Sequence, residues 1–197
     1  MSLIILAHPH FDSSIANKTI IEELNISDLN IEIRNLHDLY PDFCIDVIEE
    51  QKALLRHQTT VFQYPFFWYN MPAILKQWFD AVFIHQFAYG SEGDKLKGKN
   101  FLPSFTVGSF EDQYTTLGKH HFRIYEFCKN LEQTAYYAQM NYINPVYMHG
   151  TSGVSGYKES VIKEKAKSHA GRLIDCLKEL DHNQPEPATK KKDLPVC

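Results

Sequence analysis

The chain has 197 residues, 44% of which are hydrophobic, and its formal net charge is −4. This length suits one domain with a substantial core, and the composition is typical of a globular protein. The negative charge argues against nucleic-acid binding, and no stretch approaches the roughly 18 apolar residues of a membrane-spanning helix. The four cysteines form no CxxC pair and no zinc-like cluster with histidines. We therefore expect a cytoplasmic protein without a bound metal.

Apolar runs alternate with helical patterns along most of the chain. Strands are predicted where short apolar segments end in turn residues, and helices where apolar residues recur every three or four positions. The predicted strands are 3–7, 29–36, 60–64, 100–107 and 144–148, and the predicted helices are 14–24, 46–57, 72–83, 122–139 and 155–180. Residues 1–180 are therefore expected to form one domain. Residues 181–197, with three prolines and three consecutive lysines, are expected to form a disordered tail.

Five strands that alternate with helices predict an α/β fold with a parallel sheet and helices on both faces. The number of units suits a flavodoxin-like, five-stranded sheet with strand order 2-1-3-4-5. Ligands of such sheets bind beyond the carboxyl ends of the strands, where the strand order reverses. The loops after the first, third and fourth strands should therefore meet at one place, and these loops have unusual compositions.

The first loop connects a strand to the N-terminus of a helix, where free backbone N–H groups favour an anion such as a phosphate. Ser13, Ser14 and Asn17 add side-chain donors, and His8 adds a possible cation. The loop matches neither GxGxxG nor a Walker sequence, which disfavours Rossmann and P-loop interpretations. A plain capped helix beside a surface histidine is the alternative.

The second loop carries four consecutive aromatic residues, Phe66, Phe67, Trp68 and Tyr69. A planar ligand would give these rings stacking partners, whereas packing in the core is the alternative for some of them. The third loop contains small residues whose backbone can approach the edge of a ring closely. The relevant residues of this third loop are Thr106, Val107, Gly108 and Ser109.

Tyr114 and His120 follow the third loop and lie six residues apart. Such a pair near a redox-active ring could relay a proton or stabilise charge, although two ordinary surface side chains are an equally simple interpretation. A weaker alternative is a metal or hydrolase site built from His8, His10, His120 and His121. No supporting carboxylate or cysteine spacing accompanies these histidines.

Several motifs resemble the NAD(P)H:quinone oxidoreductase family of the flavodoxin-like fold. They are LIILAHP at 3–9, SIAN at 14–17, WYNMPAILKQW at 68–78, FI at 83–84 and FAYG at 87–90. Within the family, ANK at 16–18 and LYPDFCID at 39–46 are most similar to the ancillary proteins of the glutathione-regulated potassium-efflux system. The resemblance covers about residues 2 to 180.

The resemblance implies a flavin cofactor, with FMN favoured and FAD as the alternative, NAD(P)H as co-substrate and a quinone as acceptor. It assigns the phosphate loop to His8, Ser14, Ile15, Ala16 and Asn17, and the segment beside the flavin ring to Phe66, Phe67, Trp68 and Tyr69. Backbone contacts to the ring fall to Thr106, Val107, Gly108 and Ser109, of which Val107 and Ser109 depart from the family's Thr-Thr-Gly-Gly. The Cβ of Ser109 is expected to narrow the approach to the ring.

Further roles are implied by the same resemblance. Tyr114 and His120 match the pair credited with charge relay during hydride transfer, and Tyr89 matches an aromatic residue of the substrate pocket, reached across a homodimer interface. The activity implied is ping-pong hydride transfer through the flavin. The alternative is a regulatory subunit at the inner face of a membrane that activates a potassium/proton antiporter, with the flavin as a sensor or structural element.

Overall fold

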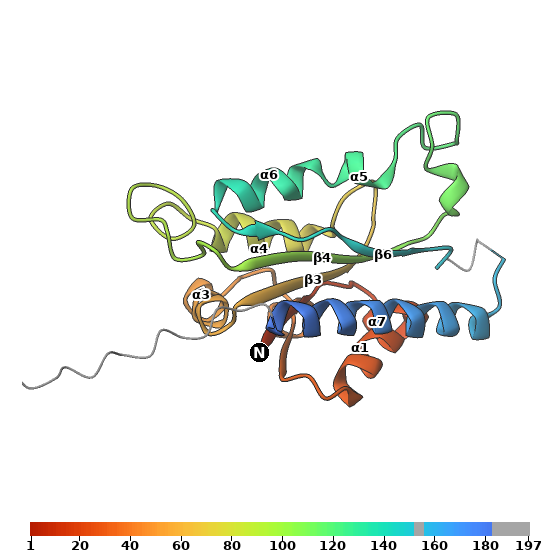
Figure 1. The fold of residues 1–197 in the computed structure, drawn as a ribbon, viewed down its shortest axis with the longest axis horizontal. Helices are drawn as coiled ribbons and strands as arrows, with labels where there is room; N and C mark the ends of the chain where they lie inside the picture. Colours follow the sequence, from red (N-terminus) through yellow and green to blue (C-terminus); the bar gives the residue numbers. More distant parts are fainter. Residues whose placement is uncertain (152–155, 183–197) are drawn as a thin grey trace, which may run out of the picture.

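A computed structural model describes residues 1–151 and 156–182 of the chain. It contains a parallel sheet between two layers of helices (Figure 1). The strands are β1 Ser2–Leu6, β2 Ile31–Asn35, β3 Thr59–Pro65, β4 Asn100–Val107, β5 Asn141–Tyr142 and β6 Val146–His149. The helices are α1 Ile15–Ile26, α2 Leu36–Leu39, α3 Val47–Arg56, α4 Ala73–Val82, α5 Ile124–Phe127, α6 Lys129–Tyr137 and α7 Glu159–His182, and short 3₁₀ turns span Phe11–Ser13 and Glu111–Gln113.

The order of the sheet is β2-β1-β3-β4-β5, with every pair parallel, which confirms the predicted flavodoxin-like topology. The predicted strand at 144–148 corresponds to β6, which pairs with β4, and the two-residue β5 is a sixth strand that was not predicted. β5 pairs with the start of β4 and β6 with its end, and Pro145 stands between them. Proline has no backbone N–H to donate to the ladder, which accounts for the interruption at this point.

The two faces of the sheet bury separate cores because successive side chains of a strand point to opposite sides. Leu3, Ile5 and Phe62 pack with residues of α3, α4 and α6 on one face. Ile4 and Val61 pack with residues of α1 and α7 on the other. Figure 1 shows α1 and α7 side by side beneath the sheet, and α4, α5 and α6 above it.

The boundaries of two predicted helices needed correction. The segment predicted as one helix over 122–139 is divided into α5 and α6, and Cys128 ends the first and precedes the second. Cys128 is buried together with Ile124, Leu131 and Ala135. These four residues keep helical spacing across the break, so the sequence pattern predicts a single helix. The last helix, predicted to start at residue 155, begins at Glu159, and residue 155 itself lies outside the described residues. Residues 181 and 182, predicted as the start of a tail over 181–197, belong to α7, and the rest of that predicted tail lies outside the described residues.

A buried acidic residue connects β2, α3 and α4. Glu50 of α3 is completely buried, and its carboxylate accepts hydrogen bonds from four donors. Arg34 donates from Nε at 2.8 Å and from Nη2 at 2.6 Å, Tyr40 from its hydroxyl at 2.6 Å and Trp78 from Nε1 at 2.7 Å. A buried carboxylate is tolerated only when it is paired and hydrogen-bonded in this way.

Candidate functional site

A hollow of about 520 Å³ opens at the carboxyl ends of β1, β3, β4 and β6, where the strand order reverses. This is the place at which the three unusual loops were expected to meet. The hollow is lined by His8, Ser13, Ser14, Ile15, Ala16, Asn17, Pro65, Phe66, Phe67, Thr106, Gly108, Thr151, Tyr157, Glu159 and Ile162.

The first turn of α1 forms one wall of the hollow. Ser14 is the N-cap, and its Oγ accepts a hydrogen bond from the backbone N–H of Asn17 at 3.2 Å. The N–H groups of Ile15 and Ala16 precede the first intrahelical bond and have no helical carbonyl to reach. These N–H groups and the positive end of the helix dipole create a suitable environment for an anionic group.

His8 lies at the end of β1 and does not supply the expected positive charge. Burial, with smaller contributions from His10 and His37, lowers its pKa to about 4, so the imidazole is neutral at pH 7. Its Nδ1 accepts a hydrogen bond from the backbone N–H of His10 at 3.1 Å. In the neutral ring the proton then resides on Nε2, so His8 can act as a hydrogen-bond donor.

The aromatic loop after β3 divides into a wall and an exposed tip. Phe66 is partly buried and stacks on Phe105 with 5.5 Å between ring centroids, and Phe67 beside it lines the hollow. Trp68 and Tyr69 both have positive φ, at 47° and 64°, inside a tight turn closed by reciprocal backbone hydrogen bonds between Phe67 and Asn70. Positive φ is strained for residues with bulky side chains, and such strain often occurs at functional sites. The side chain of Trp68 at the tip of the turn is 92% exposed.

The loop after β4 contributes to the hollow through two of its four predicted residues. Thr106 and Gly108 line it, whereas the side chain of Val107 is buried in the core. Ser109 is not among the lining residues, and its carbonyl accepts the backbone N–H of Gly150 at 3.0 Å. The expected narrowing of the hollow by the Cβ of Ser109 therefore has no counterpart in this geometry.

Tyr114 and His120 contact one another beside the aromatic loop. Their rings stack with centroids 4.3 Å apart and an interplanar angle of 22°. The hydroxyl of Tyr69 lies 3.3 Å from Nδ1 of His120, and Nε2 of His120 is buried without a hydrogen-bond partner among the described residues. Burial raises the pKa of Tyr114, and burial together with Lys119 and His121 lowers that of His120. Both shifts favour the uncharged form, so neither Tyr114 nor His120 carries charge at neutral pH.

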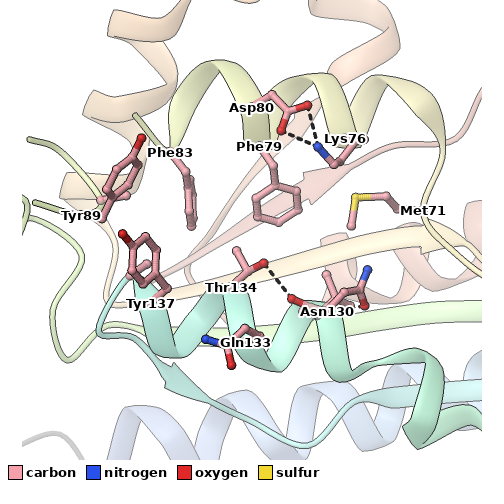
Figure 2. A pocket seen from close by; sticks show the side chains of 13 residues that line it. Met71, Lys76, Phe79, Asp80, Phe83, Tyr89, Asn130, Gln133, Thr134 and Tyr137 are labelled. Carbon is pink, nitrogen blue, oxygen red and sulfur yellow. Dashed lines mark hydrogen bonds and ion pairs between the residues drawn. The ribbon is translucent and has the colours of Figure 1, made fainter. Parts of the chain in front are cut away.

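Tyr89 lies away from these residues. It lines a second hollow of about 480 Å³ between α4 and α6, which shares no lining residue with the first. Figure 2 shows Tyr89 and Phe83 facing Tyr137 of α6, and the rings of Tyr89 and Tyr137 lie 5.3 Å apart. Within a single chain, Tyr89 is therefore not brought to the strand ends.

Ser13, named from the sequence as a donor of the first loop, lines the hollow, whereas five other lining residues were missed, namely Pro65, Thr151, Tyr157, Glu159 and Ile162. Thr151 follows β6, and its N–H and hydroxyl both donate to the carbonyl of Val107 at 3.2 Å. Because β6 is parallel to β4, its carboxyl end opens on the same edge of the sheet. Recognition of this strand end as a fourth contributing loop would have identified Thr151.

Two further findings concern the parts of the chain that the structure describes. No three histidine, cysteine, aspartate or glutamate residues are grouped so that they could hold a metal ion, so the histidine-cluster alternative has no support there. None of the described helices combines the length and the apolar character that crossing a membrane requires.

Comparison with known proteins identifies relatives over almost the entire chain. A family model described as a flavodoxin-like fold matches residues 2–173. The uncharacterised NAD(P)H oxidoreductase YrkL of Bacillus subtilis is 38% identical over 177 residues, which cover 90% of this chain and 97% of that protein. The glutathione-regulated potassium-efflux system ancillary protein KefF of an Enterobacter species is 39% identical over 176 residues, covering 89% and 96% of the two chains.

A crystal structure of general stress protein 14 from Treponema denticola in complex with FMN superimposes with a TM-score of 0.80. It is 31% identical and covers 93% of this chain and 99% of that one. The sheet order, the family match and the position of the hollow at the strand ends are all those of a flavodoxin-like protein. The chain belongs to the flavodoxin-like family that includes these NAD(P)H oxidoreductases and potassium-efflux ancillary proteins.

Proposed function

We propose that this protein binds FMN in the strand-end hollow and transfers hydride from NAD(P)H to a quinone. The observation that carries this proposal is the meeting of anion-binding donors at the start of α1 with the ring of Phe67 and the small Gly108 in one hollow. The phosphate of flavin mononucleotide suits the donors at the start of α1, and its planar ring suits Phe67 and Gly108. The FMN complex of a relative and the oxidoreductase name of another support the assignment.

The residues present fit such a ligand. The donors at the phosphate end are the N–H groups of Ile15 and Ala16 and the hydroxyl of Ser14. The lining residues of the hollow include no lysine or arginine. At the ring end, Phe67 provides an exposed aromatic surface and Gly108 leaves backbone accessible.

When bound, the flavin supplies reversible acceptance of a hydride, which is the chemistry that side chains cannot perform. The chain's own residues position it and manage the accompanying proton. The stacked pair of Tyr114 and His120 holds a hydroxyl and an imidazole next to the aromatic loop, where they can stabilise negative charge or move a proton. Successive use of one face by NAD(P)H and then by the quinone would give ping-pong kinetics.

The absorbance spectrum of the purified protein tests the cofactor assignment. We expect a yellow protein whose released cofactor has the mass of FMN rather than FAD, and which oxidises NADH or NADPH in the presence of a quinone. Initial rates at several concentrations of both substrates should give parallel double-reciprocal lines. A colourless protein that cannot be reconstituted with FMN would overturn the proposal.

A regulatory role is the second candidate, because the relative KefF is named as an ancillary protein of a potassium-efflux system. In this role the chain binds and activates a potassium/proton antiporter at the cytoplasmic face of a membrane. Co-purification with the antiporter, and potassium efflux that survives Tyr114→Phe with His120→Ala, would support it. Absence of any membrane-protein partner in a pull-down would contradict it.

We further propose that the chain acts as a homodimer in which Tyr89 completes the substrate pocket of the partner subunit. The separation of Tyr89 from the strand-end hollow of its own chain supports this arrangement. Sedimentation of the purified protein should show twice the mass of 22.9 kDa. A monomer that turns over a quinone at full rate would contradict the arrangement.

A further inference from the structure

A completely buried histidine lies on the opposite side of the sheet core from the aromatic loop. His169 of α7 is 0% exposed, and its Nε2 lies 2.8 Å from Oγ of Ser104 in β4. Ser104 in turn donates its hydroxyl proton to Oε1 of Gln63 in β3 at 2.6 Å. A polar side chain in such a position requires a partner, and here each partner is itself completely buried.

The chain of hydrogen bonds continues to the wall of the strand-end hollow. Nε2 of Gln63 donates to Oδ1 of Asn17 at 2.8 Å. The two protons on Nδ2 of Asn17 then reach Oγ1 of Thr106 at 3.0 Å and Oγ of Ser14 at 3.3 Å. Asn17 is 1% exposed, so its carboxamide is held between the sheet and the first turn of α1. An uninterrupted series of side-chain bonds therefore runs from α7 to two hydroxyls that line the hollow.

This series has a direction. The single hydroxyl proton of Ser104 forms the hydrogen bond to Oε1 of Gln63. Toward His169, the oxygen of Ser104 can therefore act only as an acceptor, and Nε2 of His169 is the donor. His169 therefore carries its proton on Nε2. Its Nδ1 faces the backbone of Tyr147 but forms no hydrogen bond of normal geometry in the described part of the chain. Burial, with a smaller contribution from Arg172, lowers the pKa of His169 to about 3, so the ring stays neutral and has one proton only.

The direction matters at the far end. Because the Asn17 carboxamide presents its NH₂ group to Ser14 and Thr106, both hydroxyl oxygens act as acceptors there. Their own protons remain available to donate elsewhere, and both residues line the hollow. If the carboxamide were reversed, its oxygen would accept those two protons, and an anion would lose two donors. Buried polar networks that are fully satisfied specify one arrangement strongly.

We propose that His169 is a positioning residue: its N–H, relayed along the face of the sheet that α1 and α7 cover, determines which way the Asn17 carboxamide faces and so turns two hydroxyl protons toward a bound phosphate. The inference rests on the proposed binding of FMN. It gives His169, which is not a lining residue of the hollow, a specific role in recognition of the phosphate. It predicts that damage to the relay weakens binding of a phosphate-bearing flavin and spares a flavin without the phosphate.

The test compares the dissociation constants of FMN and of riboflavin, which lacks the phosphate, for the apoprotein and its variants. We expect His169→Leu and Ser104→Ala to weaken FMN binding about 10-fold, the effect of lost hydrogen bonds to a charged group, and to change riboflavin binding by less than about 2-fold. His169→Gln places an amide N–H near the position of Nε2 and should restore most of the FMN affinity.

Leu173→Ala is the matched control, because Leu173 is a buried residue of α7 that takes no part in these hydrogen bonds. It should destabilise the protein and leave the ratio of the two dissociation constants unchanged. Ser104→Ala removes a single oxygen, so it remains informative if His169→Leu does not fold. An unchanged ratio in Ser104→Ala, or equal weakening of both flavins, would overturn the inference. A wild-type protein that binds riboflavin as tightly as FMN would instead overturn the proposed phosphate site.

Discussion

Replacement of Glu50 by alanine is expected to lower the free energy of unfolding by about 3–5 kcal/mol. The four hydrogen bonds to this carboxylate come from Arg34, Tyr40 and Trp78. Removal of one partner from a buried ion pair leaves the other charge without compensation, and it leaves the indole and phenol donors unpaired as well. Urea denaturation at pH 7, followed by circular dichroism, measures the change.

Glu49 provides the control, since it is the preceding residue of the same helix and its side chain is exposed. Its ion pair with Lys52 at 2.7 Å lies on the surface, where such pairs contribute about 0–1 kcal/mol. Glu49→Ala should therefore change stability by less than about 1 kcal/mol. Equal effects of the two substitutions would mean that the buried cluster is not a major source of stability. The intermediate variant Glu50→Gln, which keeps the shape and loses the charge, should fall between them.

Tyr114→Phe combined with His120→Ala is expected to lower quinone reduction about 100-fold while FMN remains bound. The two rings stack directly on one another, and the Tyr69 hydroxyl lies 3.3 Å from Nδ1 of His120. Loss of both removes the groups that can stabilise charge or move a proton during hydride transfer. Stopped-flow absorbance, with the NAD(P)H and quinone half-reactions measured separately, identifies which step slows.

Leu117→Ala is a suitable comparison for this double variant. Leu117 lies in the same loop and is 99% exposed, so its removal perturbs the loop without removing a polar group. Its turnover should remain within about 2-fold of the wild type, as is usual for surface substitutions. Turnover of the double variant at the wild-type rate, with flavin bound, would show that Tyr114 and His120 have no catalytic role.

Local patterns were sufficient to predict the sheet order and the position of the candidate site. Apolar runs such as 3–7 and 100–107 identify strands because a strand covered on both faces must be apolar throughout. Strands that alternate with helices form doubly wound parallel sheets with a known strand order. This order brings the loops at Ser14, Phe67 and Gly108 together. Most of the predicted lining residues were found in this way, without knowledge of any contact.

Other features depended on contacts between residues far apart in the sequence. The neutral state of His8 follows from its burial. The contact of His120 with Tyr69 joins residues 51 positions apart. The polar series from His169 to Asn17 joins α7 to α1 through two strands of the sheet, β4 and β3. Periodicity carries no information about such partners, because it describes only which face of an element is covered.

The sequence by itself determined the fold class, the sheet order and the edge of the sheet at which a ligand would bind, because these follow from hydrophobic periodicity and the geometry of parallel strands. The tertiary structure alone decided which residues of each loop face the hollow. It separated Tyr89 from that hollow and Val107 from its lining. Side-chain direction and charge state depend on neighbours that only the folded chain brings into contact, so these properties could not be read from the order of the residues.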